Sequence, residues 1–253
     1  MKGIQVVIPM AGLGTRFVQD GYSIPKPILP IGNLKMIEVV LQNLTSNHVE
    51  KVVIVTKTEI SQASSLPQLL SKYPFEVKII LIDETTDGPA TTCVLAKNQL
   101  DMDKPLVIAN SDQFLDTDME LEYDRWDVTT TDGIIWAMED SSPKWSYVRT
   151  DTNGFAQEVR EKIVISNLAT CGVYAYSRAI EFFDAYDKMV ATNDRTNNEF
   201  YVAPTYNYLI ADGKRILVRD LGKAGTVMHG LGIPEDYEAF LLSGIPARLN
   251  QSI

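Results

Sequence analysis

The chain has 253 residues, of which 45% are hydrophobic and 22% are charged, and its formal net charge is −10. An acidic chain gains little from contact with nucleic acid or an anionic membrane, because it releases no counterions there. No apolar run approaches the roughly 20 residues of a membrane helix. We therefore expect neither of these partners, and any bound phosphate must be held by a local cluster of cations.

The two cysteines, Cys93 and Cys171, lie far apart and outside any CxxC motif. Unpaired cysteines of this kind are typical of reducing compartments. The apolar stretch near the start is short and is followed at once by Gly12, Gly14 and Arg16, so it is better interpreted as a first β-strand than as a secretion signal. These features predict a cytoplasmic protein.

Short apolar runs rich in Val and Ile recur through the first half, at residues 5–9, 52–56, 77–82, 106–109 and 134–138. Such runs are typical of strands buried on both faces of a sheet. Residues 34–44 have the apolar spacing of a helix, and Gly88-Pro89 followed by residues 90–100 indicates another. Alternation of strands and helices predicts a parallel sheet.

The second half has a different pattern. Residues 147–151 and 155–160 flank Asn153-Gly154, which favours a hairpin with a type I′ turn. Helices are predicted at 178–188, at 198–211 and from Pro234 onward. The fold class we expect is α/β, with a Rossmann-like mixed, mostly parallel sheet flanked by helices. We expect one domain over residues 1–253, with a nucleotide-binding half at about 1–140 and an acceptor half at about 141–253.

The most informative segment directly follows the first predicted strand. It contains Ala11, Gly12, Gly14, Thr15 and Arg16. Ligands of open α/β sheets bind beyond the carboxyl ends of strands, and glycines let backbone N–H groups approach a phosphate. The guanidinium of Arg16 presents a fixed set of donors to phosphate oxygens. The segment therefore predicts a phosphate site.

Lys26, in the sequence Pro25-Lys26-Pro27, adds a second cation on a stiff loop. The P-loop motif fails here because its Lys-Ser/Thr is absent, and the dinucleotide motif fails because Phe17 stands where its third glycine belongs. The arrangement resembles the sugar nucleotidyltransferase family, whose opening combines this glycine–arginine loop with a Pro-Lys-Pro. The resemblance implies a GT-A-like nucleotidyltransferase fold.

The resemblance extends over nearly the whole chain. Matching segments are DGPA at 87–90, NSD at 110–112, EK at 161–162, TCGVY at 170–174, NEFY at 198–201 and GIPED at 232–236. Each motif is short, but their order and spacing together are specific. The resemblance implies an enzyme that joins a nucleoside triphosphate to a sugar 1-phosphate and releases pyrophosphate.

The resemblance also implies roles for single residues. Arg16 and Lys26 would hold the triphosphate, Lys162 would hold the attacking phosphate, and Asp112 would bind Mg²⁺. The remaining nucleotide contacts would come from Ala11, Gly12, Gly14, Thr15, Asp83, Gly88 and Ser111. The acceptor would be contacted by Ser146, Glu161, Gly172, Tyr174 and Asn198.

Two nucleotide-binding residues carry more detailed expectations. Gly88 should lie against the nucleobase, where a side chain would collide. Asp83 stands where relatives often carry glutamine, and an ionised carboxylate only accepts hydrogen bonds. It would therefore suit cytosine or guanine, which present an amino group, better than thymine.

The chain departs from the family pattern at two places. Ser146 stands where members that use glucose have glycine, which puts glucose 1-phosphate in doubt. Gly230 stands where many members have a second metal-binding aspartate. The metal would then depend on Asp112 with nucleotide oxygens and water, or on a substitute ligand, for which Asp236, Asp220 and His229 are the candidates.

Three alternatives remain open. The acceptor could be a non-sugar phosphate, such as a polyol phosphate or a phosphocholine-like compound. The chain could be a glycosyltransferase of the same fold type, which would use no triphosphate, although the cations at 16 and 26 argue against that. It could also be a non-catalytic protein that retains the nucleotide pocket. The sequence leaves a homo-oligomer open.

Overall fold

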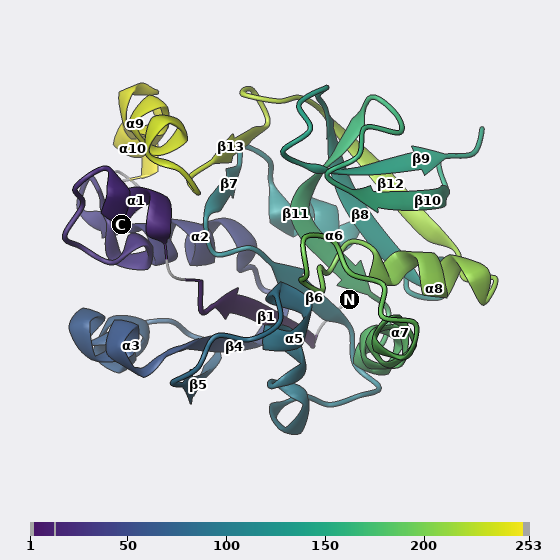
Figure 1. Ribbon diagram of the computed structural model, residues 1–253, viewed down its shortest axis with the longest axis horizontal. Helices are drawn as coiled ribbons and strands as arrows, with labels where there is room; N and C mark the ends of the chain where they lie inside the picture. The colour runs from purple at the N-terminus through teal and green to yellow at the C-terminus, as the bar shows by residue number, and fades with distance from the viewer. Residues whose placement is uncertain (1–2, 13, 250–253) are drawn as a thin grey trace.

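The computed structural model describes residues 3–12 and 14–249. Its centre is a nine-stranded sheet in the order β10-β9-β11-β6-β1-β4-β5, to which β8 and β12 add beside β11. Helices lie on both faces of this sheet (Figure 1). The predicted α/β class with a mostly parallel, helix-flanked sheet is confirmed.

Four strands form the parallel part of the sheet: β1 (Ile4–Met10), β4 (Val49–Lys57), β5 (Glu76–Ile82) and β6 (Leu106–Ala109). Strand β1 lies between β4 and β6, with Val6 opposite both Val52 and Val107. All four were predicted from their apolar runs. The carboxyl end of β1 leads directly into the glycine–arginine loop.

The second half of the sheet is mixed. It contains β8 (Gly133–Glu139), β9 (Ser146–Thr150), β10 (Ala156–Glu161), β11 (Leu168–Tyr176) and β12 (Ile216–Lys223). Strand β11 runs antiparallel to β6 and to β8, and β12 runs parallel to β8. Strand β11 therefore joins the parallel strands to the later ones.

The remaining elements surround this sheet. The longer helices are α2 (Met36–Leu44), α3 (Thr58–Ser64), α7 (Ala179–Ala191), α8 (Thr205–Ala211) and α9 (Pro234–Leu242). Shorter helices are α1 (Thr15–Gln19), α4 (Leu66–Leu70), α5 (Pro89–Val94), α6 (Met119–Asp124), α10 (Ile245–Leu249), η1 (Lys26–Ile28) and η2 (Lys97–Gln99). Two small sheets pair β2 (Pro30–Ile31) with β3 (Leu34–Lys35), and β7 (Gln113–Leu115) with β13 (Met228–Gly230).

The core lies on both faces of the sheet because side chains alternate along β1. Val6 and Ile8 pack in the cluster that contains Val40 of α2, whereas Val7 packs in the cluster that contains Cys93 of α5 and Phe182 of α7. All of these side chains are buried. Burial on both faces explains why β1 is apolar at nearly every position.

A third cluster brings the first and last parts of the chain together. The ring of Phe17 in α1 meets Tyr237 of α9 edge-on, with 5.9 Å between ring centroids. Figure 1 shows α1, α9 and α10 side by side at one end of the sheet. The glycine–arginine loop and the Pro234 helix, far apart in sequence, therefore share one packing unit.

Two predicted helices are shorter than expected. The predicted helix 198–211 begins only at Thr205. Asn197 and Asn198 have left-handed backbones with φ of 49° and 65°, and Phe200 N–H donates to the carbonyl of Asp87 at 2.7 Å, so the segment before α8 is a packed loop. The predicted helix 90–100 ends at Val94 as α5 and resumes as the 3₁₀ turn η2.

The hairpin between β9 and β10 is present, but its turn is not the predicted type I′. That turn needs positive φ at both central residues. Here Gly154 has φ of 83° and Asn153 does not have a positive φ. The carboxylate of Asp151 accepts the N–H groups of Asn153 and Phe155, which holds a three-residue loop in place.

Both cysteines, Cys93 and Cys171, are free and buried. Within residues 3–12 and 14–249, none of the helices has the length and apolar character needed to cross a membrane.

Candidate active site

A cavity of about 780 Å³ opens beyond the carboxyl ends of β1 and β6 and extends to β9, β10 and β11. Its lining contains most of the residues singled out from the sequence: Ala11, Gly12, Arg16, Lys26, Gly88, Ser111, Asp112, Ser146, Glu161, Lys162, Gly172 and Tyr174. As the described residues define it, the lining does not include Gly14, Thr15, Asp83 or Asn198. Residues separated by more than 150 positions therefore converge on one cleft.

Gly14 and Thr15 support the cavity from outside its lining. Gly14 has φ of 59°, and a Cβ atom there would come within 3.3 Å of the Cβ of Lys26. Thr15 is the first residue of α1, and Arg16 follows it. The glycine therefore allows the loop to pack against Lys26, which places the two cations of this end, Arg16 and Lys26, on one wall.

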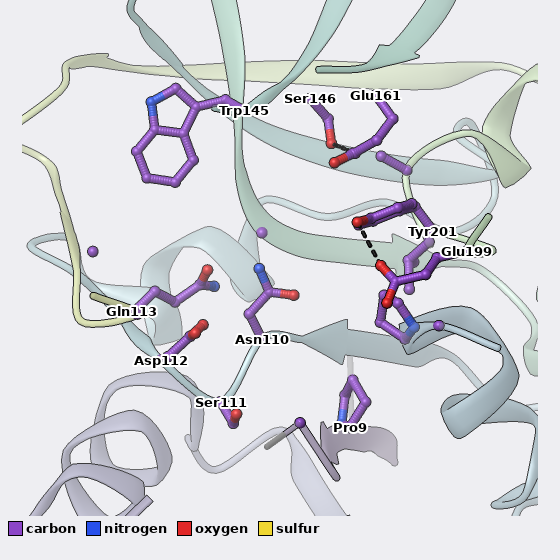
Figure 2. A pocket seen from close by; sticks show the side chains of 18 of the residues that line it. Pro9, Asn110, Ser111, Asp112, Gln113, Trp145, Ser146, Glu161, Glu199 and Tyr201 are labelled. Atoms are coloured by element: carbon purple, nitrogen blue, oxygen red, sulfur yellow. Dashed lines mark hydrogen bonds between the residues drawn. The ribbon is translucent and has the colours of Figure 1, made fainter. Parts of the chain in front are cut away.

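Asp112 follows β6 and forms an ion pair with Lys26. The Nζ atom of Lys26 lies 2.7 Å from Oδ2 of Asp112, and the two side chains are only 15% and 26% exposed. A Cβ atom on Gly232 would lie 2.8 Å from the same Oδ2. A side chain at 232 would therefore displace this carboxylate, which faces the cavity beside Asn110 and Gln113 (Figure 2).

The three candidates for the missing second carboxylate lie in different places. His229 packs against Phe114 and Phe240, and burial lowers the pKa of its imidazole. Asp220 accepts a hydrogen bond from the N–H of Gly222 and is not among the described residues that line the cavity. Neither is placed to substitute for the missing ligand.

Asp236 does line the cavity. It lies in the first turn of α9, and its Oδ2 accepts a hydrogen bond from Nζ of Lys144 at 3.1 Å. A Cβ atom on Gly230 would lie 3.0 Å from the same Oδ2. The carboxylate of Asp236 therefore occupies space beside Gly230 that a side chain at 230 would enter.

Polar groups gather at the opposite end of the cavity. The hydroxyl of Ser146 donates a hydrogen bond to the carboxylate of Glu161, as Figure 2 shows. Glu161 is 7% exposed, and its burial raises the pKa of its carboxyl group above the ordinary value of 4.5. The hydroxyls of Tyr174 and Thr170 lie 2.8 Å apart, and burial raises the pKa of Tyr174. This end can recognise hydroxyl groups.

Lys162 belongs to a network that the sequence did not reveal. Its backbone is left-handed, with φ of 57°, and its Nζ donates to the hydroxyl of Tyr201 at 2.7 Å. That hydroxyl donates in turn to Oε2 of Glu199 at 2.6 Å, the second contact drawn in Figure 2. A strained backbone held by a side-chain network indicates that the position of this ammonium group matters.

Gly88 lines the cavity, and backbone packing requires a glycine there. A Cβ atom there would lie 2.6 Å from the carbonyl oxygen of Phe200, and the φ of Gly88 is 115°. The collision is with the protein backbone, so packing alone explains the glycine. At Gly172, with φ of 70°, a Cβ atom would meet the amide groups of Gln113 at 2.1 Å and Asn110 at 2.4 Å. That glycine makes room for two polar side chains of the cavity.

Asp83 and Asn198 do not reach the cavity in this structure. The carboxylate of Asp83 accepts a hydrogen bond from the hydroxyl of Thr58 at 2.7 Å, and the carbonyl of Asn198 accepts one from Arg195 at 2.9 Å. The preference for cytosine or guanine that rested on Asp83 therefore has no support in this geometry. Threonines 85 and 86 and Asn197 line the cavity in their vicinity.

Further lining residues were missed at the level of sequence: Asn110, Gln113, Lys144, Trp145, Glu199 and Tyr201. The Nζ of Lys144 lies over the Trp145 ring, 4.6 Å from its centroid. A usable signal existed for four of them, because Asn110, Glu199 and Tyr201 lie inside motifs already recognised and Gln113 directly follows one. Sequence alone gave no reason to pair Lys144 with Asp236 or Lys162 with Tyr201.

Comparison with known proteins agrees with this geometry. The sequence profile of the nucleotidyl transferase family matches residues 5–215. Because that match covers most of the chain, the chain belongs to the nucleotidyl transferase family, and the predicted membership is confirmed. A curated relative, the bifunctional protein GlmU of Methanococcus aeolicus, is 26% identical over 182 residues. The alignment covers 70% of this chain but spans only 41% of the length of that relative.

Solved structures share the fold. A nucleoside-diphosphate-sugar pyrophosphorylase from Vibrio cholerae RC9 superposes with a TM-score of 0.78 at 24% identity, covering 94% of this chain and 100% of its own. The inositol-1-phosphate CTP transferase from T. maritima superposes with a TM-score of 0.75 at 13% identity, covering 97% of each chain. At sequence identities of 24% and 13%, these superpositions show a shared fold.

Proposed function

We propose that this chain is a nucleotidyltransferase that transfers a nucleoside monophosphate from a nucleoside triphosphate to a phosphorylated small molecule. The observation that carries the proposal is the convergence of Arg16, Lys26 and Lys162 with Asp112 in one cavity of a chain whose net charge is −10. Two anionic substrates can meet only where fixed cations offset their repulsion. The cavity is the place in the described chain where this condition is met.

The reaction itself needs positioning and charge neutralisation. An oxygen of the acceptor phosphate attacks the α-phosphorus, a new P–O bond forms, and the bond to the bridging oxygen breaks so that pyrophosphate leaves. Arg16 and Lys26, on the glycine-loop wall, suit the triphosphate and the departing pyrophosphate. Lys162, at the end of β10, suits the acceptor phosphate.

The site fits a divalent cation. Asp112 offers a hard oxygen ligand in a space that Gly232 keeps open, and its partner in this structure, Lys26, is itself a cation. Mg²⁺ held there would neutralise charge on the transferred phosphoryl group. The described residues include no group of three or more His, Cys, Asp or Glu side chains suited to a metal, so the substrate phosphates and water would complete the coordination.

The acceptor end favours a polyhydroxylated phosphate. Ser146, Glu161 and Tyr174 offer hydroxyl and carboxyl groups, and Trp145 offers an apolar face. A sugar 1-phosphate fits this chemistry, and the product would be a nucleoside-diphosphate sugar. An alternative is a cyclitol or other polyol phosphate, favoured by the hydroxyl of Ser146 in place of glycine and by the fold shared with an inositol-1-phosphate CTP transferase.

We place the reaction in the cytoplasm, where nucleoside triphosphates are available and where the buried free thiols of Cys93 and Cys171 would stay reduced. Nucleotide sugars commonly supply surface polysaccharide synthesis, and that use is part of the proposal.

A screen for pyrophosphate release tests this proposal. The four ribonucleoside triphosphates and dTTP are each incubated with Mg²⁺ and a panel of sugar 1-phosphates and polyol phosphates. We expect release that requires one triphosphate and one acceptor together. Turnover of a nucleoside-diphosphate sugar without any use of triphosphate would favour the glycosyltransferase alternative. Triphosphate binding without release on any acceptor would favour a binding protein.

A further inference from the structure

With glycine at 230, the proposed metal site lacks a second carboxylate from that position. The carboxylate of Asp236, in the neighbouring helix α9, lies beside Gly230. An aspartate at 230 would carry its carboxylate oxygens roughly 2.4 Å from its own Cβ by standard bond lengths. The Oδ2 atom of Asp236 lies 3.0 Å from the position of that Cβ. A carboxylate oxygen is thus present close to where one from residue 230 would be, although it comes from α9.

The two carboxylates have matching surroundings. Gly230 is the last residue of β13, and Gly232 lies two residues further on, in the bend that leads to α9. Oδ2 of Asp236 lies 3.0 Å from the Cβ position of the first glycine, and Oδ2 of Asp112 lies 2.8 Å from that of the second. Both aspartates and both glycines line the cavity. Two carboxylate oxygens from different elements therefore approach the same short glycine segment on the cavity wall.

Each carboxylate is paired with a lysine in this structure. Lys26 lies 2.7 Å from Asp112, and Lys144 lies 3.1 Å from Asp236. A divalent cation could replace both ammonium groups at the carboxylates. The released lysines line the cavity and would be free to contact phosphate oxygens.

We propose that Asp236 is the second protein ligand of the divalent cation and takes the place of the aspartate that is missing at position 230. This inference rests on the proposed function and adds to it a relocated ligand. It explains how a chain with glycine at 230 retains two carboxylates at the metal. It also assigns Gly230 a role, because a Cβ atom there would lie 3.0 Å from Oδ2 of Asp236 and would shift this carboxylate.

The test measures Mn²⁺ binding directly, by electron paramagnetic resonance of free Mn²⁺ during titration of the full chain. Mn²⁺ accepts the same oxygen ligands as Mg²⁺. We expect Asp236→Asn to weaken Mn²⁺ binding by about tenfold or more, the size of effect seen when groups that support a metal are removed. Glu235→Gln is the matched control, because it removes an exposed carboxylate from the same helical turn and should leave Mn²⁺ binding unchanged.

A double variant gives the sharper result. Gly230→Asp combined with Asp236→Ala returns the carboxylate to position 230 and removes the side chain that would crowd it, so Mn²⁺ binding should recover toward the wild-type value. A loss caused by misfolding would not recover, and circular dichroism melting of each variant checks this independently. Equal Mn²⁺ affinity in Asp236→Asn and Glu235→Gln would overturn the inference, as would wild-type protein that binds no Mn²⁺.

Failure of this inference can be told apart from failure of the proposed function. If Asp112→Asn abolishes Mn²⁺ binding and Asp236→Asn does not, Asp236 is not a ligand, while pyrophosphate release by the wild-type chain would still establish the transferase. If the wild-type chain binds Mn²⁺ through both aspartates but releases no pyrophosphate, the metal site stands and the proposed function is wrong.

Discussion

The Nζ atom of Lys162 donates a 2.7 Å hydrogen bond to the hydroxyl of Tyr201, and this bond joins the end of β10 to the loop before α8. The same ammonium lies 4.6 Å from the centroid of the Tyr201 ring. Because Tyr201 donates its own proton to Glu199, its oxygen lone pairs are free to accept from Lys162. The network directs the lysine toward one region of the cavity before any acceptor arrives.

Replacing Tyr201 by Phe should disorient Lys162 without removing its charge. We expect kcat/KM for the acceptor to fall about tenfold, the value of one hydrogen bond to a charged group, with little change in KM for the triphosphate. Steady-state kinetics with each substrate varied in turn measure this. Tyr208→Phe is the control, since that tyrosine makes similar hydroxyl contacts with Thr192 and Asp194 outside the cavity lining. Equal loss in both variants would contradict a positioning role.

Removing the ammonium altogether should have a larger effect. Lys162→Ala is expected to lower kcat by about 100-fold or more, as loss of a group that stabilises transition-state charge does, while the Kd of the triphosphate changes little. Equilibrium binding of the triphosphate and single-turnover rates separate these quantities. Lys223→Ala removes an exposed lysine of β12 and provides the charge-matched control. Full activity in Lys162→Ala would remove this residue from the mechanism.

Gly88 offers a test of the packing explanation. Gly88→Ala should lower the free energy of unfolding by about 1–3 kcal/mol more than Gly213→Ala, because the added methyl group overlaps the Phe200 backbone. Both glycines have positive φ, but a Cβ atom at Gly213 would meet no described atom within 4 Å. Urea unfolding without ligand measures the difference. Equal stability of the two variants would restore a nucleobase contact as the reason for the glycine.

The imidazole of His229 should make stability depend on pH. Burial lowers its pKa below the ordinary value of 6.5. Between the lowered pKa and pH 6.5, the imidazole is therefore protonated in the unfolded chain but neutral in the folded chain. This contribution is fully present above pH 6.5 and is lost as the pH falls toward the lowered pKa, at up to about 1.4 kcal/mol per pH unit. His229→Phe, which suits the ring cluster with Phe114 and Phe240, should flatten the dependence between pH 7.5 and 5.5 in urea unfolding. An unchanged slope would show that another group is responsible.

The buried carboxylate of Glu161 should lower the stability of the fold at neutral pH while it contributes to acceptor binding. Burial raises its pKa above 4.5, so its contribution to stability is present below pH 4.5 and is lost as the pH rises through the raised pKa. Glu161→Gln should therefore be more stable than the wild type at pH 8, but not at pH 4. The same variant should bind the acceptor about tenfold more weakly. Thermal melting at the two pH values and acceptor titration check both parts, and Glu139→Gln, at the exposed end of strand β8, is the control.

The sequence was sufficient to predict those elements whose structure depends on residues close together in the chain. The parallel strands and the glycine–arginine loop were predictable, because burial on both faces leaves a continuous apolar run and phosphate approach demands small residues. Strands β11 and β12 were not among the predicted strands. The length of α8 could not be predicted either, because two successive left-handed asparagines, Asn197 and Asn198, break the helical pattern.

The contacts of the site depended on the fold. The Lys144–Asp236 pair spans 92 positions and the Lys162–Tyr201 pair spans 39, so no local periodicity indicates either. The motif order placed most lining residues in one cleft correctly. It also placed Asp83 and Asn198 in a cleft that they do not reach here.

The pairing of β11 with β6 has a mechanical consequence. Tyr174 lies opposite Ile108 in one continuous sheet, and the N–H of Asn110 donates to the carbonyl of Gly172 at 3.0 Å, directly beneath the cavity. The two ends of the cavity are therefore joined by continuous main-chain hydrogen bonds. A motion that separated them would have to break these bonds, so we expect any closure over the substrates to involve the rim loops around residues 140–145 and 195–204 instead.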